Sequence, residues 1–144
     1  MRISSPAFEA EGRIPAEYTC EGDDINPEIR IEEVPEDTES LVMILDDPDA
    51  PSKTWLHWLV YDIPPGKSVI AEDSVPGTEG TNDFDRRSYG GPCPPSGEHR
   101  YYFRVYALDA RLDLGEGSFR SEVEKAMKGH VLDSGELMGK YSKA

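Results

Sequence analysis

Leu41–Leu45 reads LVMIL and is followed at once by Asp46–Pro51, which reads DDPDAP. A continuous apolar run that ends at a turn-forming segment is typical of a strand covered on both faces. Trp55–Ile63 and Arg100–Leu108 carry apolar or aromatic side chains at both odd and even positions, which also favours central positions in a sheet. The sequence therefore predicts a large central sheet that is sandwiched between other layers.

The rest of the pattern predicts an outer strand and helices near the end of the chain. Glu28–Glu32 reads EIRIE and alternates as a half-buried strand does. Ser121–Glu124 has the form of a capping box and Gly129 a stop signal, so we expect a helix between them. A second short helix is expected after Asp133 or Ser134. The predicted fold class is all-β: a Greek-key-like β-sandwich with short C-terminal helices.

Length and charge restrict the classes of function. A chain of 144 residues can bury roughly 68–70% of the surface that its unfolded form exposes, so we expect residues 1–144 to form a single domain. Fifteen Lys and Arg against 29 Asp and Glu give a net charge of −14, which argues against nucleic acid as a partner. There is no apolar run of membrane-spanning length and no apolar signal segment at the start. We therefore expect no membrane span and a cytoplasmic location.

Strand directions bring polar side chains to one end of the predicted sheet. The apolar run leaves the sheet just before Asp47, and the next strand carries His57 near its start. Antiparallel pairing would put these two residues at the same end. The strand that opens at His99 joins them if it flanks the apolar run on its other side. Tyr101 shares the parity of His99 and is expected to face the same pocket.

The segment ahead of His99 is predicted to form the rim of this pocket. Gly90–Pro95 reads GGPCPP, and such dense Gly and Pro punctuation fixes a loop before any ligand arrives. Gly90 and Gly91 are expected to leave backbone N–H groups approachable for phosphate or sulfate oxygens. Pro92 is expected to stiffen the rim.

The two histidines and the carboxylate predict a positive spot inside a negative protein. Imidazoles beside a carboxylate are expected to hold at least one proton at pH 7, shared between His57 and His99 near Asp47. A lone histidine in an aromatic strand is usually a packed core residue, and Asp47 and Asp49 also suit plain turn formation. The ligand site is favoured because both histidines open strands next to turns rich in Pro and Gly.

Motifs along nearly the whole chain resemble those of one known family. They are DDPDAP at Asp46–Pro51, WLHW at Trp55–Trp58, GGPCPPSGEHRY at Gly90–Tyr101, YTCEGDDINP at Tyr18–Pro27, GTNDF at Gly80–Phe84 and YFRVYALD at Tyr102–Asp109. They resemble the phosphatidylethanolamine-binding protein family, also known through the Raf kinase inhibitor proteins. The short chain is similar to the compact bacterial and archaeal members.

The resemblance implies a binding protein without enzymatic activity. The pocket of that family takes small anions and phosphorylated head groups, and its motif residues map onto Asp47, Asp49, Pro51, His57, Gly91, Pro92, His99 and Tyr101. The resemblance also implies a protein kinase or serine protease as a regulated partner, a homodimer, and a cis peptide bond at Ala50–Pro51. Neither a cofactor nor a metal is expected.

The cysteines leave alternatives open. Cys20 and Cys93 are expected to be reduced, unreactive thiols in a chain without a signal segment, and a disulfide between them is less favoured. One alternative makes Cys93 the nucleophile of a hydrolase, with His57 or His99 as its base. A second makes Asp47 and the two histidines ligands of a metal ion. Against the hydrolase, Cys93 lies between prolines, where no helix can lower the pKa of its thiol.

Three further features lie outside the main motifs. Ala71–Ser88 is polar and long for a compact domain, so we interpret it as a functional loop. His130 follows Gly129 and is expected to cap the last carbonyl groups of the predicted helix. Tyr141 is expected from the resemblance to close over the pocket.

Overall fold

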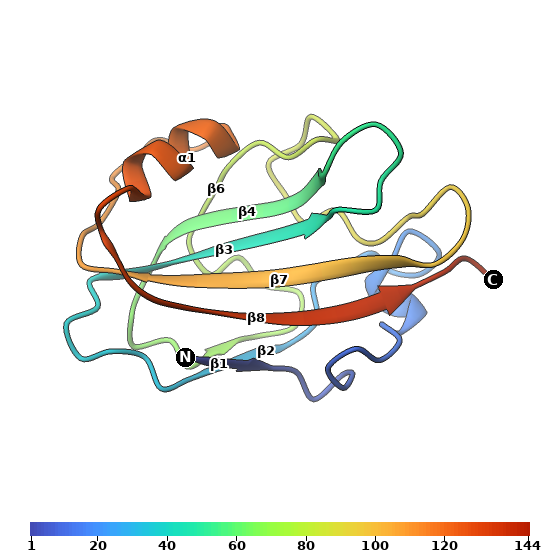
Figure 1. Ribbon diagram of the computed structural model, residues 1–144, viewed down its shortest axis with the longest axis horizontal. Coiled ribbons are helices and arrows are strands. Elements are labelled where there is room, and N and C mark those ends of the chain that lie inside the picture. The colour runs from blue at the N-terminus through green and yellow to red at the C-terminus, as the bar shows by residue number, and fades with distance from the viewer.

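Two antiparallel β-sheets and one α-helix make up the computed structural model, which describes residues 1–144 (Figure 1). The strands are β1 Arg2–Ser4, β2 Ile29–Glu32, β3 Ser40–Asp47, β4 Trp55–Ile63, β5 Val69–Ile70, β6 Thr78–Glu79, β7 His99–Leu108 and β8 Val131–Tyr141; the helices are α1 Arg120–Met127 and the 3-10 turn η1 Ala16–Tyr18. The larger sheet has the strand order β6-β4-β3-β7-β8 and the smaller β1-β2-β5. Neither helix has the length and apolar character needed to cross a bilayer. The predicted two-sheet β fold is confirmed.

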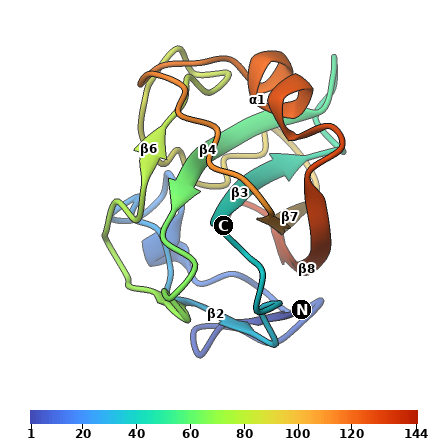
Figure 2. The ribbon, with the colours of Figure 1, turned by 90° about the vertical axis from the view of Figure 1, so that its left-hand side faces the viewer.

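The sheets and the helix form three layers. Figure 2 shows the small sheet on one side of the large sheet and α1 on the other. The main core fills the space between the sheets, where Leu41, Met43 and Leu45 of β3 are completely buried. Val42 and Ile44 point the other way, into a second core beneath α1. The strand is therefore covered on both faces, as its continuous apolar sequence predicts.

β3 runs antiparallel to both of its neighbours. Leu45 lies opposite Trp58 of β4 on one side and opposite Phe103 of β7 on the other. β4 and β7 therefore run in the same direction, and both begin at the end of the sheet where β3 stops. This predicted arrangement is confirmed, and it brings the starts of both strands beside Asp47.

The C-terminal part differs from the prediction in two ways. The residues after Asp133 belong to the edge strand β8, which pairs with β7 along most of its length, so the predicted second helix is wrong. Glu136–Met138 are good helix formers, but continuous cross-strand pairing outweighs this weak preference. The N-cap of α1 is Phe119 rather than Ser121, and the carboxylate of Glu122 accepts the Phe119 N–H at 2.9 Å.

Asp46, near the end of β3, connects the large sheet to α1. Its side chain is buried, and the residue is only 1% exposed. Its carboxylate accepts a hydrogen bond from Arg120 of α1 at 2.9 Å and forms an ion pair with Arg104 of β7 at 3.2 Å. A buried carboxylate is tolerated only when it is paired and hydrogen-bonded. This shared carboxylate therefore fixes the position of the helix on the sheet.

Replacing Asp46 should test this connection. Asp46→Ala leaves Arg104 and Arg120 without their common partner, and because these side chains are 25% and 28% exposed, water compensates in part. We expect the free energy of unfolding to fall by about 1–3 kcal/mol in urea denaturation. Glu136→Ala removes the exposed partner of the same Arg104 and should cost about 0–1 kcal/mol. Equal losses in both variants would contradict a special role for Asp46.

Candidate functional site

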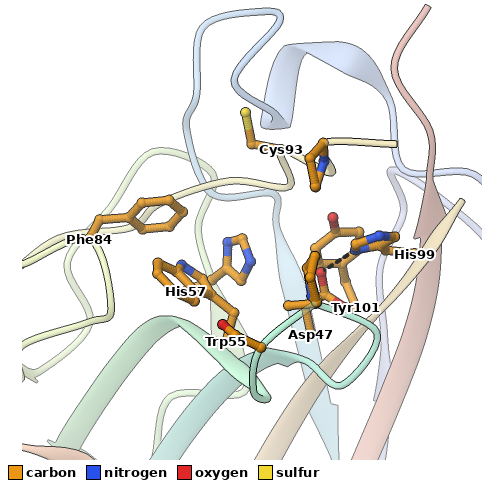
Figure 3. A pocket seen from close by; sticks show the side chains of 11 residues that line it. Asp47, Trp55, His57, Phe84, Cys93, His99 and Tyr101 are labelled. Atoms are coloured by element: carbon orange, nitrogen blue, oxygen red, sulfur yellow. Dashed lines mark hydrogen bonds and ion pairs between the residues drawn. The ribbon is translucent and has the colours of Figure 1, made fainter. Parts of the chain in front are cut away.

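A cavity of about 250 Å³ opens at the end of the large sheet where β3 stops and β4 and β7 begin (Figure 3). Of the residues predicted from the sequence, the cavity is lined by Asp47, Pro51, His57, His99 and Tyr101. The other predicted site residues, Asp49, Gly90, Gly91 and Pro92, do not line it. They belong to the two loops that surround it.

His57 reaches the cavity because β4 contains a β-bulge. Leu45 of β3 lies opposite Trp58 and Asp46 lies opposite Leu56, so His57 is an extra residue on β4. A bulge interrupts the alternation of side chains along a strand. As a result the side chains of His57 and Trp58, although adjacent in the sequence, lie on the same face of the sheet. Trp58 packs into the main core, and His57 lines the cavity.

The backbone of Gly90 fixes the orientation of the His57 ring. Nδ1 of His57 lies 2.7 Å from the Gly90 carbonyl oxygen, and the Gly90 N–H donates to the His57 carbonyl at 3.0 Å. Nδ1 must carry the hydrogen, because a carbonyl oxygen only accepts. Burial lowers the pKa of His57, although the Gly90 carbonyl and the charge of Asp47 oppose this shift. The predicted proton shared by both histidines is therefore wrong: His57 is neutral.

Of the two histidines, Asp47 pairs only with His99. Its Oδ2 lies 2.7 Å from Nδ1 of His99, and its Oδ1 accepts the backbone N–H of Asp49 at 2.8 Å. The two paired residues are only 3% and 7% exposed. Both carboxylate oxygens are thus engaged, and the pairing puts the hydrogen of Nδ1 toward Asp47. Nε2 of His99 has no partner within the protein.

Tyr101 lies between the two imidazoles (Figure 3). Its ring centroid is 5.3 Å from that of His57 and 6.4 Å from that of His99. Burial raises the pKa of Tyr101, and the charge of Asp47 acts in the same direction, so the hydroxyl keeps its proton. This hydroxyl is buried and has no hydrogen-bond partner. Such an unpaired group is costly, and an acceptor placed in the cavity would satisfy it.

Asp49 shapes the loop between β3 and β4 rather than the cavity itself. Its carboxylate accepts hydrogen bonds from the Arg100 side chain at 2.8 and 2.9 Å and from the Arg100 N–H at 2.9 Å. This clamp holds the loop that puts Ala50 and Pro51 on the cavity wall. The chain contains no cis peptide bond, so the cis bond predicted at Ala50–Pro51 is wrong. The turn that Arg100 holds therefore has only trans peptide bonds.

Gly90 and Gly91 present no free N–H groups to the cavity. The Gly90 N–H is bonded to His57, and the Gly91 N–H donates to the carboxylate of Asp24 at 2.7 Å. A Cβ atom on Gly91 would lie only 2.4 Å from the carbonyl oxygen of Tyr18. The predicted phosphate cradle at these glycines is therefore wrong. Gly91 instead allows two backbone segments to pack closely.

Cys20 and Cys93 form a disulfide, with their Cα atoms 5.5 Å apart. The prediction of two free thiols is wrong, because the fold brings the segment after η1 against the rim loop. The Cys20 N–H also donates to the Pro92 carbonyl at 3.1 Å. In Figure 3 the sulfur of Cys93 points away from His57 and His99. The hydrolase alternative therefore lacks the free thiol that it requires.

The metal alternative also fails on geometry. Both oxygens of Asp47 already accept hydrogen bonds, from the Asp49 N–H and from His99. No group of three or more His, Cys, Asp or Glu side chains is arranged to hold a metal ion. The predicted cluster of Asp47, His57 and His99 is thus divided into a carboxylate–imidazole pair and a separate neutral imidazole.

Asn82 organises the cavity wall, a role not predicted for it although it lies in the GTNDF motif. Its side-chain amide donates to the carbonyl groups of His57 at 3.0 Å and Ser88 at 2.8 Å, and its oxygen accepts the N–H groups of Phe84 and Arg86. The turn so formed puts the ring of Phe84 edge-on against His57, with centroids 5.2 Å apart. Asn is a strong turn former, so the sequence NDF carried this signal. The loop predicted to be functional thus supplies one wall.

Two predicted roles near the end of the chain are wrong. The hydroxyl of Tyr141 donates to the carboxylate of Glu21, and its ring packs against the Arg13 guanidinium at 4.5 Å, so it does not close over the cavity. His130 pairs through Nδ1 with Asp109 at 2.8 Å instead of capping carbonyl groups through its ring. Both side chains bind residues from segments distant in the sequence.

Comparison with known proteins agrees with the motifs and the fold. Residues 4–142 match the family model described as phosphatidylethanolamine-binding protein. The chain belongs to the phosphatidylethanolamine-binding protein family. A UPF0098 protein of Methanothermobacter thermautotrophicus is 46% identical over 98% of both chains, and one of Chlamydia trachomatis is 40% identical over 99% of both.

Two solved structures of the phosphatidylethanolamine-binding protein family are similar over nearly the whole chain. A homologue from Chlamydia trachomatis superimposes with a TM-score of 0.96 at 39% identity and covers 99% of this chain and 97% of its own. E. coli YbcL, described as a new member of the mammalian family, has a TM-score of 0.91 at 26% identity, with 99% and 98% covered. The two-sheet arrangement is thus that of the family.

Removing the disulfide should lower the stability of this family member. The bond closes a loop between residues 73 positions apart, so its loss increases the entropy of the unfolded chain. For the double variant Cys20→Ser, Cys93→Ser we expect the free energy of unfolding to fall by about 2–4 kcal/mol. A dithiol reductant should bring wild type to the same urea midpoint and leave the variant unchanged. An equal midpoint in wild type and variant without reductant would contradict the disulfide.

The clamp between Asp49 and Arg100 should show a defined pH dependence. Hydrogen bonds from Arg100 lower the pKa of Asp49 to about 2, whereas an unfolded Asp has a pKa of about 3.9. The clamp therefore stabilises the fold above about pH 4, and its contribution is lost as the pH falls towards 2. Because this pair is partly exposed, Asp49→Asn should cost up to about 1 kcal/mol at pH 7. Thermal unfolding should show this gap narrowing as the pH falls from 5 towards 2; a constant gap would argue against the clamp.

Proposed function

We propose that this protein is a non-enzymatic binding protein whose cavity holds a small anionic ligand, a phosphate or a phosphorylated head group. One observation carries the proposal. Nε2 of His57, Nε2 of His99 and the hydroxyl of Tyr101 belong to cavity-lining residues and make no hydrogen bond within the protein. Buried polar groups are nearly always paired, so a cavity with three free polar atoms suits a ligand with several oxygens.

The apolar wall of the cavity favours a ligand that has an apolar portion in addition to its anionic group. Trp55 and Phe84 meet edge to face, with ring centroids 5.7 Å apart, and both line the cavity together with Pro51 and Pro95. Ligand sites commonly combine such an apolar wall with a few placed polar groups. A cavity of about 250 Å³ suits a small phosphorylated molecule, with its apolar portion against these walls.

The charges around the cavity fit a weakly charged anion. Asp47 offers no free oxygen, because it accepts from His99 and from the backbone. The Tyr101 hydroxyl can donate its O–H to an oxygen of the ligand. Hydrogen bonds of this kind are stronger in a buried site than in water. Binding without catalysis is favoured because Cys93, the candidate nucleophile, is held in a disulfide.

Tyr101→Phe separates a ligand-binding role of the hydroxyl from a structural one. The hydroxyl has no partner in the protein, so its removal should leave the melting temperature without ligand unchanged or slightly higher. Loss of one hydrogen bond to phosphate should weaken binding by about 0.5–1.5 kcal/mol in calorimetry.

Tyr102→Phe is the matched control for this variant. Tyr102 is the next residue on β7, and its hydroxyl accepts only a 3.3 Å hydrogen bond from Arg100. We expect this control to bind phosphate like wild type. Phosphate binding by Tyr101→Phe at wild-type strength would contradict the proposal that this cavity binds the ligand.

A further inference from the structure

The hydrogen-bonding state of His57 restricts what its free nitrogen can bind. Nδ1 donates its hydrogen to the carbonyl of Gly90 at 2.7 Å. In a neutral imidazole the other nitrogen, Nε2, then has only a lone pair and accepts a hydrogen bond. His57 is 3% exposed, and burial lowers its pKa, so the ring keeps this neutral state near pH 7.

The groups that face His57 do not reverse this state. They are Asp47 from β3, Tyr101 from β7 and, across the rim loop, Asp24, with His99 beyond the Tyr101 ring. Asp47 already takes a hydrogen bond from His99, and Asp24 takes the Gly91 N–H. None of these groups donates a hydrogen to Nε2 of His57. The nitrogen therefore needs a donor from the ligand.

A phosphate group meets this need only when it carries a proton. A fully deprotonated oxygen next to the lone pair of Nε2 is repelled, whereas a P–OH group donates to it. One of the remaining oxygens of the same group accepts from the Tyr101 hydroxyl. Sites whose buried polar group requires a particular donor discriminate strongly against ligands that lack it.

We propose that His57 makes the cavity selective for protonated oxyanions, inorganic phosphate or the monoanion of a phosphate monoester, over anions of similar shape that have no acidic proton. This inference rests on the proposed function, because it specifies the ligand of the same cavity. Sulfate and phosphodiesters belong to the disfavoured class. His57 acts as the specificity-determining residue, and the Tyr101 hydroxyl donates to an oxygen that all of these anions have.

Calorimetry with three probes tests the selectivity. Inorganic phosphate and sulfate have the same tetrahedral shape, and dimethyl phosphate has a single negative charge but no acidic proton. At pH 7 we expect inorganic phosphate to bind at least about tenfold more tightly than sulfate or dimethyl phosphate, the size of one hydrogen bond to a charged group. The preference for inorganic phosphate should persist at pH 9, because its dianion still carries one P–OH group.

Two variants assign the preference to His57. The amide of His57→Gln can donate a hydrogen bond to any oxygen, so the affinities for phosphate and sulfate should come within about threefold of each other. His130→Gln is the matched control, since His130 pairs with Asp109 on the surface, and it should keep the wild-type preference. Equal affinity of wild type for phosphate and sulfate, or an unchanged preference in His57→Gln, would overturn the inference alone. Failure of wild type to bind any of the three anions would overturn the proposed function as well.

Discussion

Two adjacent carboxylates at the end of β3 must be buried, and much of the structure provides partners for them. Asp46 and Asp47 are 1% and 3% exposed. Because side chains alternate along a strand, they point to opposite faces of the large sheet. Asp46 is neutralised by Arg104 and by Arg120 of α1, and Asp47 pairs with His99. Pairing of these two charges thus attaches the helix on one face and builds the floor of the cavity on the other.

The roof of the cavity is preorganised by a different set of contacts. The segment around Cys20 is joined to the rim loop by the disulfide between Cys20 and Cys93. In addition, the Gly91 N–H donates to the carboxylate of Asp24, and the Tyr89 hydroxyl donates to the carbonyl of Tyr18. These bonds connect segments far apart in the sequence and do not require a ligand. A site held in its binding geometry loses little conformational entropy on binding. The rim therefore gives shape, and the strand ends provide the polar groups.

Local patterns in the sequence predicted the strands and the position of the site. The apolar run Leu41–Leu45 identified the central strand, since only a strand buried on both faces tolerates such a sequence. The turns before Trp55 and His99 marked where the neighbouring strands begin. Antiparallel pairing then required Asp47, His57 and His99 to meet at one end of the sheet. Strand periodicity and direction are short-range properties, and they were sufficient to locate the cavity.

The chemistry of the cavity depended on contacts between distant residues. The bulge at His57 arises from its register against β3. Burial favours the neutral ring, and the carbonyl of Gly90 fixes its hydrogen on Nδ1. The Cys20–Cys93 bond likewise required two loops to meet, and β8 replaced a predicted helix because β7 offered an unpaired edge. The sequence by itself determined which residues lie near the site. Only the tertiary structure decided which of them pair, which nitrogen carries the hydrogen and which atoms remain free for a ligand, because hydrogen-bond partners and burial are set by packing between segments remote in the chain.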